Sequence, residues 1–111
     1  MNISSETHLA AVVLRLEGEF TIDEVDHFRR DVKESMETSN AHYIIDCEAL
    51  TLIDSVGLES FLWLSEELSK SGNKLRFANV SQTVSCVFEL TRLDRVFNVH
   101  DCVESAARSV G

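Results

Sequence analysis

Hydrophobic and polar positions repeat with two different periods along the chain, and each period predicts a different kind of element. Alternation of apolar and polar residues over 11–17 predicts a strand with one buried face. Apolar residues at helical spacing over 22–36, and again over 58–68, predict two amphipathic helices. A short, nearly continuous apolar run over 42–47 predicts a strand at the centre of a sheet.

Shorter signals complete the order of elements. They predict an edge strand over 3–8, a break over 18–21, a loop over 48–53, a strand over 74–80, a helix capped by Ser81, a strand over 95–99 and a final helix ending near Val110. Regular alternation of strands and helices implies a layered α/β fold with right-handed crossovers. We therefore predict a single α/β domain over 1–111, with a mostly parallel mixed β-sheet of four to five strands and about four helices.

Length, composition and charge narrow the possible roles of this domain. The chain has 111 residues, the size of one domain, and its hydrophobic share of 44% is too high for a disordered acidic tail. No apolar run reaches the roughly 18 residues of a membrane-spanning helix, and the N-terminus lacks a signal-peptide pattern. We therefore expect a cytoplasmic protein. Its formal net charge of −9 argues against nucleic-acid and membrane binding and suits a basic protein partner.

Residue patterns for metal or nucleotide binding are missing from the sequence. Cys47, Cys86 and Cys102 form no CxxC pair, and the four histidines show neither HExxH nor paired i, i+4 spacing. We expect no metal site, and we expect the cysteines to be buried, apolar thiols. Neither a P-loop nor a GxGxxG pattern occurs, so no cofactor is expected.

The segment Asp54-Ser55-Val56-Gly57 has features beyond simple packing, because it lies between a predicted loop and a helix start. Asp54 or Ser55 is placed to cap that helix, and Gly57 allows another backbone or a phosphate to come close. Free N–H groups at a helix start favour an anion, so a phosphate on Ser55 would be tolerated. A plain cap with a packing glycine is the alternative. A serine hydrolase has little support, because Ile53 stands where the nucleophile elbow needs glycine.

Four segments resemble those of the STAS domain family (sulphate transporter and anti-sigma factor antagonist). They are Leu-Glu-Gly-Glu-Phe at 16–20, Tyr-Ile-Ile-Asp at 43–46, Leu-Ile-Asp-Ser-Val-Gly-Leu at 52–58 and Leu-Asp-Arg-Val-Phe at 93–97. The Asp-Ser-x-Gly-Leu element after a buried strand is the most specific of them. Because the similarity covers nearly the whole chain, the sequence looks most like the bacterial anti-sigma factor antagonists.

The resemblance implies a regulatory role without catalysis. Ser55 would accept a phosphate from an anti-sigma factor with serine kinase activity, and a phosphatase would remove it. Asp54 and Gly57 would support this element by positioning the hydroxyl or the helix start. The unmodified domain would bind the anti-sigma factor and free sigma, whereas phosphorylation would break the complex. The kinase supplies ATP and Mg²⁺, so this chain needs no cofactor.

The same resemblance places the partner surface around this element. It implies contacts from Thr21, Val56, Leu58, Glu59 and Trp63. Three of these depart from the family pattern, since Val56 replaces a small residue, Glu59 a frequent glycine and Thr21 a frequent aspartate. Trp63 is a candidate partner anchor, with packing beneath a neighbouring loop or helix as the alternative.

Two other roles remain open at this point. The domain could be a constitutive subunit of a larger assembly, such as a lipid-transport ATPase complex or a stressosome-like scaffold. A small hydrolase that uses Ser55 with His27, His42 or His100 is the third possibility.

Overall fold

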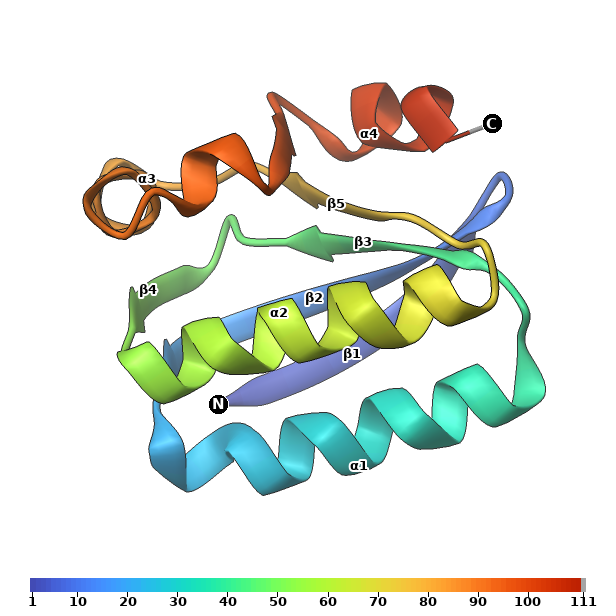
Figure 1. The fold of residues 1–111 in the computed structure, drawn as a ribbon, viewed down its shortest axis with the longest axis horizontal. Coiled ribbons are helices and arrows are strands. Elements are labelled where there is room, and N and C mark those ends of the chain that lie inside the picture. The colour runs from blue at the N-terminus through green and yellow to red at the C-terminus, as the bar shows by residue number, and fades with distance from the viewer. Residues whose placement is uncertain (111) are drawn as a thin grey trace.

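One mixed sheet with helices on both sides makes up the fold (Figure 1). The computed structural model describes residues 1–110. Within them the strands are Asn2–His8 (β1), Ala11–Phe20 (β2), His42–Asp46 (β3), Leu50–Ile53 (β4), Leu75–Ala78 (β5) and Asn98–His100 (β6). The helices are Ile22–Thr38 (α1), Ser55–Lys70 (α2), Gln82–Leu90 (α3) and Val103–Val110 (α4), with a 3-10 turn at Leu93–Arg95.

The strand order confirms the predicted α/β fold with a mostly parallel sheet. The order is β1-β2-β3-β5-β6, and β4 pairs with β2 beside this path. The β1 strand runs antiparallel to β2, which confirms the predicted edge strand, and the other pairings are parallel. Helices α1 and α2 lie side by side along one face, while α4 packs on the other face over β3 and β5 (Figure 1).

Most of the segment predicted as a break (18–21) and most of the segment predicted as a loop (48–53) belong to strands, which corrects two predictions. The β2 strand continues past Gly18 to Phe20, and its last residues pair with β4 instead of β3. A register shift between Gly18 and Glu19, with Gly18 at φ +100°, allows this change of partner. The sequence gives a weak signal here because β4 has only four residues.

The strand predicted over 95–99 is also shifted. Residues Leu93–Arg95 form a 3-10 turn, and the strand starts only at Asn98. Phe97 turns inward between them, where its N–H donates to the Leu93 carbonyl at 2.8 Å and its ring is buried. The apolar pattern that predicted a strand therefore reflects one buried ring in a turn.

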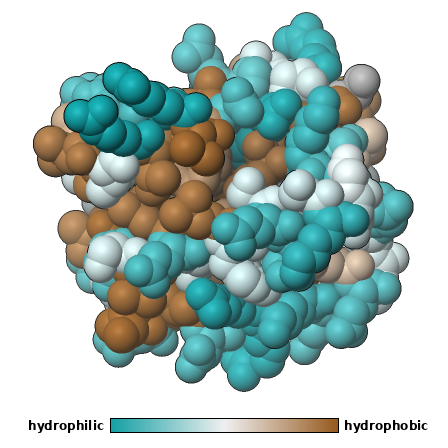
Figure 2. All heavy atoms as spheres, in the orientation of Figure 1, coloured by the Kyte–Doolittle hydropathy of each residue, from teal (hydrophilic) through white to brown (hydrophobic). Residues whose placement is uncertain are grey.

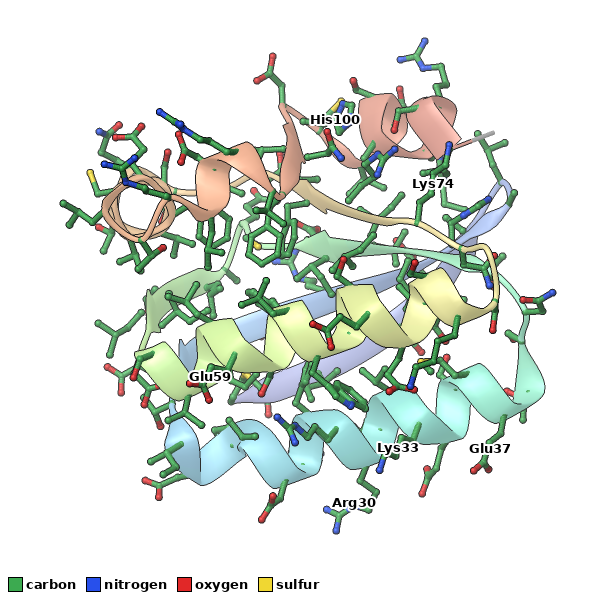
Figure 3. The ribbon with its side chains drawn as sticks, in the orientation of Figure 1. Arg30, Lys33, Glu37, Glu59, Lys74 and His100 are labelled. Carbon is green, nitrogen blue, oxygen red and sulfur yellow. The ribbon has the colours of Figure 1, made fainter. Side chains whose placement is uncertain are left out.

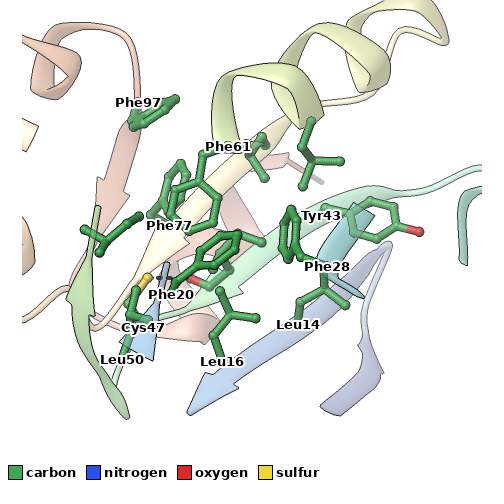
Figure 4. Close-up of a cluster of buried hydrophobic side chains, with 14 of the residues drawn as sticks. Leu14, Leu16, Phe20, Phe28, Tyr43, Cys47, Leu50, Phe61, Phe77 and Phe97 are labelled. Atoms are coloured by element: carbon green, nitrogen blue, oxygen red, sulfur yellow. Dashed lines mark hydrogen bonds between the residues drawn. The ribbon is translucent and has the colours of Figure 1, made fainter. Parts of the chain in front are cut away.

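Aromatic rings dominate the larger of two cores. All six phenylalanines are buried between the sheet and the helices, and their rings contact one another in a continuous cluster: Phe20, Phe28, Phe61, Phe77, Phe88 and Phe97. Figure 4 labels all of these rings except Phe88. Such tilted and edge-on ring pairs add about 0.5 to 1.5 kcal/mol each beyond their burial. The smaller core lies beneath α4, around Ile44 and Ala106. Both faces of the central strands are therefore covered.

The three cysteines differ in their exposure to solvent. Cys47 is buried, whereas Cys86 and Cys102 are exposed, so the expectation of three buried thiols is wrong for two of them. Their chain positions explain this, because Cys86 is on the outer side of α3 and Cys102 precedes α4.

Among residues 1–110, no helix is both long enough and apolar enough to cross a membrane.

Candidate functional site

Asp54 ties together the starts of the two long helices. Its Oδ1 accepts a hydrogen bond from the Gly57 N–H at 2.8 Å, which caps α2. Its Oδ2 accepts one from the Ile22 N–H at 2.9 Å, at the first residue of α1. The Asp54 N–H in turn donates to the Phe20 carbonyl at 3.1 Å. One carboxylate thus satisfies donors from two helices that would otherwise lack a partner.

The sheet brings these groups together, because β4 pairs with the end of β2. Ile53 is opposite Phe20 in this pairing. The next residues, Thr21 and Asp54, therefore lie at the same edge of the sheet, and each directly precedes a helix. Thr21 occupies the cap position of α1 with an extended backbone, but its side chain makes no capping hydrogen bond. Asp54, from 33 residues further along, provides that acceptor instead. This long-range cap has no local sequence signal.

Ser55 is the first residue of α2, and its side chain is exposed. Because Asp54 caps the helix, the Ser55 hydroxyl is not used for capping. It makes no hydrogen bond with any group in the described part of the chain, residues 1–110. The choice left open between Asp54 and Ser55 as the cap is therefore decided for Asp54.

Gly57 has a packing role. A Cβ at this position would lie 2.7 Å from the Phe20 carbonyl oxygen and 3.0 Å from Ile53 Cγ1. Real Cβ atoms do not approach a backbone oxygen so closely, so glycine allows α2 to start directly against the end of β2. The close neighbour anticipated at Gly57 is thus the protein's own backbone.

The residues expected to contact a partner lie in different surroundings. Val56 is half-buried beside Ser55, and Glu59 is exposed one turn further along α2. Leu58 is only 5% exposed and packs in the larger core, so it stabilises the fold, and its contact with a partner stays a prediction. Trp63 is half-buried against the same core, and Arg29 of α1 lies over its ring at 5.2 Å. These contacts agree with the packing alternative for Trp63, while its role as a partner anchor stays a prediction.

Exposed apolar side chains surround this end of the molecule. Ile22 at the start of α1 is 63% exposed, and Leu52 of β4 is 43% exposed. Figure 2 shows hydrophobic surface over the end where β4, α3 and the starts of α1 and α2 meet. Sequence reasoning placed Ile22 on the buried stripe of α1 and overlooked Leu52. A helix stripe that begins at the very first residue is a weak sign of burial, since the chain there is still leaving the sheet.

The geometry gives no support to a serine hydrolase. Within residues 1–110, the polar contacts of the three histidines considered for a triad are with other groups. His27 lies beside Glu24 and Asp31, His42 accepts from the Lys74 N–H, and His100 contacts Ser105. No cluster of three or more potential metal ligands occurs in the same described residues.

Fold and site together define a small α/β domain with an exposed serine at a capped helix start. The family model of the STAS domain matches residues 2–106. The chain therefore belongs to the STAS domain family, whose members are generally not enzymes.

Solved structures show the same fold at low identity. A putative anti-sigma factor antagonist from Thermotoga maritima is 22% identical, with a TM-score of 0.89 over 97% of this chain and 93% of that one. The anti-sigma factor antagonist SpoIIAA, unphosphorylated, is 24% identical, with a TM-score of 0.82 over 97% and 96%. The phosphorylated form of SpoIIAA from Bacillus is 23% identical, with a TM-score of 0.73 over 97% and 99%.

Proposed function

We propose that this chain is an anti-sigma factor antagonist that binds an anti-sigma factor with serine kinase activity and loses that binding when Ser55 is phosphorylated. The observation that carries the proposal is the exposed Ser55 hydroxyl, which no capping bond uses and which a rigid helix start holds on the surface. The domain would act in the cytoplasm without a cofactor of its own, and a phosphatase would restore the binding form. The similarity in fold to SpoIIAA, a protein solved with and without phosphate, supports the proposal.

The surroundings of Ser55 suit a surface that a charge can disrupt. Ile22, Leu52 and Val56 offer apolar area for a partner beside the hydroxyl. A phosphate there adds about −1.5 to −2 charges, which must be desolvated when the partner closes over the apolar surface. Asp54 and the exposed Glu59 already carry negative charge within one turn of Ser55, so repulsion adds to that cost.

The test uses a candidate anti-sigma factor kinase from the same organism, with ATP and Mg²⁺. We expect phosphate on Ser55 by mass spectrometry, no phosphate on Ser55→Ala, and normal phosphorylation of Ser69→Ala. Ser69 is a matched control because it is also an exposed serine of α2. Ser55→Asp should fail to bind the partner, and Ser69→Asp should bind like the wild type. Binding that survives Ser55→Asp, with no phosphate on Ser55, would contradict the proposal and favour a constitutive subunit of a larger assembly.

A further inference from the structure

The side of the molecule where α1 faces α2 carries a basic and aromatic surface on an otherwise acidic protein. Arg29, Arg30 and Lys33 provide three of the ten basic residues within five positions of α1, against a net charge of −9. Trp63 of α2, the single tryptophan, lies beside them. Figure 3 shows Lys33 on α1 and Arg30 directed away from α2, so Arg30 adds to the charge from the adjacent side.

The cations lie over the tryptophan ring. The Arg29 guanidinium carbon is 5.2 Å from the ring centroid, and Lys33 Nζ is 5.8 Å from it. Cation–π contacts of this kind contribute about 0.5 to 1 kcal/mol at exposed sites. The ring therefore restricts the Arg29 and Lys33 side chains, which lowers the entropy they lose when an anion binds.

These cations have no carboxylate partner within residues 1–110. Asp26 lies three residues before Arg29, and Glu37 lies four residues after Lys33, spacings at which helical ion pairs form. Neither pair comes within 4.0 Å, nor does any other carboxylate in that range reach Arg29, Arg30 or Lys33.

Two other cations show the contrast. Arg15 of β2 lies within 4.0 Å of Glu17, Asp46 and Glu48. Lys70 pairs with Glu67 at 3.0 Å. In addition, Arg29 Nε is buried without a hydrogen-bond acceptor among residues 1–110. A buried donor of this kind costs free energy as long as no acceptor reaches it.

We propose that Arg29, Lys33 and Trp63, here called the basic–aromatic face, bind an acidic segment of a partner protein. A guanidinium group donates two parallel hydrogen bonds to one carboxylate, while a neighbouring ammonium holds a second carboxylate at the spacing of one helical turn. Charge complementarity favours an acidic segment over a second copy of the chain. A second copy carries its net charge of −9 over its whole surface, so the two copies repel each other outside this face. A short segment rich in Asp and Glu brings its charge to the face alone.

This docking surface is separate from the one around Ser55. Trp63 follows Ser55 by eight residues of α2, which at about 1.5 Å per residue places it roughly 12 Å along the helix. That is more than the screening length of about 8 Å at physiological ionic strength. Phosphorylation or an aspartate at Ser55 should therefore leave binding at the basic–aromatic face unchanged, so the two proposals can fail independently.

The test is a titration of the intact chain with a short acetylated peptide of alternating Glu and Ser, with Gln in place of Glu as the neutral control. Fluorescence of Trp63 reports binding directly, because no other tryptophan contributes. We expect the acidic peptide to change the emission and the neutral peptide to have no effect. Rising salt should weaken the binding.

Lys33→Glu and Lys74→Glu form a matched pair, since each reverses one exposed positive charge. Figure 3 shows Lys74 by β5, on the far side of the sheet from α1. We expect Lys33→Glu to weaken peptide binding about tenfold and Lys74→Glu to leave it within about twofold, as expected when a like charge replaces a direct partner. Arg30→Glu is a second variant if Lys33→Glu does not fold, with a smaller expected loss of a few fold. Equal effects of the matched pair, no binding of the acidic peptide, or binding only to anionic vesicles or to a second copy would each overturn the proposal.

Discussion

Replacing Asp54 tests the double cap, because one carboxylate holds the starts of α1 and α2. Loss of an N-cap side chain costs about 0.5 to 2 kcal/mol, which covers the bond from the Gly57 N–H. The bond from the Ile22 N–H is also accepted by a charged group but is open to solvent, so it adds about 1 kcal/mol. We therefore expect Asp54→Ala to lower the free energy of unfolding by about 1.5 to 3 kcal/mol.

Asp54→Asn separates the two bonds. Its amide has one oxygen, so it can cap α2 through the Gly57 N–H but then turns an NH₂ group toward the Ile22 N–H. We expect about half of the loss seen for alanine. Amide hydrogen exchange should show faster exchange at Ile22, with Gly57 protection retained.

Urea unfolding measures these changes. With a slope of about 1 to 3 kcal/mol per molar urea, Asp54→Ala should lower the midpoint by about 0.5 to 3 M. Asp23→Ala is the control, because Asp23 is exposed in the first turn of α1 and contributes mainly through the helix dipole, about 0.3 to 1 kcal/mol. The reasoning is refuted if Asp54→Ala costs no more than Asp23→Ala, or if asparagine costs as much as alanine.

Three further predictions follow from single side chains. Gly57→Ala should destabilise the fold by up to about 2 kcal/mol in urea unfolding, because a contact of 2.7 Å with the Phe20 carbonyl outweighs the gain of about 1 kcal/mol in helix propensity; a more stable variant would contradict this. A thiol reagent should label Cys86 and Cys102 in the native protein and Cys47 only after unfolding, since burial raises the pKa of the Cys47 thiol; three equally fast thiols would be the wrong result. Burial also raises the pKa of Tyr43, the single tyrosine, against a lowering effect of its hydrogen bond with Ser35, so its phenolate absorbance should appear only above the usual pH of about 10. The neutral phenol is then favoured in the fold, so stability should be constant below about pH 10 and fall as the pH rises further; ionisation at the same pH in the native and the unfolded protein would refute this.

Periodicity predicted the elements that have clear amphipathic patterns. The apolar stripe of α1 and the alternation of β2 are both long enough to be read without tertiary information, and Ser81 caps α3 as expected, accepting from the Val84 N–H at 3.2 Å. The β4 strand was not predicted, because four residues carry little pattern and its partner is the far end of β2. Pairing across the sheet, not local propensity, makes it a strand.

Only the part of the site that depends on neighbouring residues in the chain was predicted from the sequence. Its position at the start of α2 follows from local sequence, since Asp54 directly precedes the helix. The second bond of Asp54, to Ile22, joins residues 32 apart and depends on how β2 and β4 end at one edge. The burial of Leu58, by contrast, follows from local sequence, because Leu58 begins the apolar stripe that predicted α2.

The central claim is tested most directly by the affinity of an anti-sigma factor partner for the unmodified and the Ser55-phosphorylated chain, measured by calorimetry under the same salt conditions. Burying an unpaired charge at an interface costs about 2 to 5 kcal/mol, which is about 30-fold to several-thousand-fold in the dissociation constant. We predict a loss of at least about 30-fold on phosphorylation of Ser55. Equal affinities for the two forms would contradict the account.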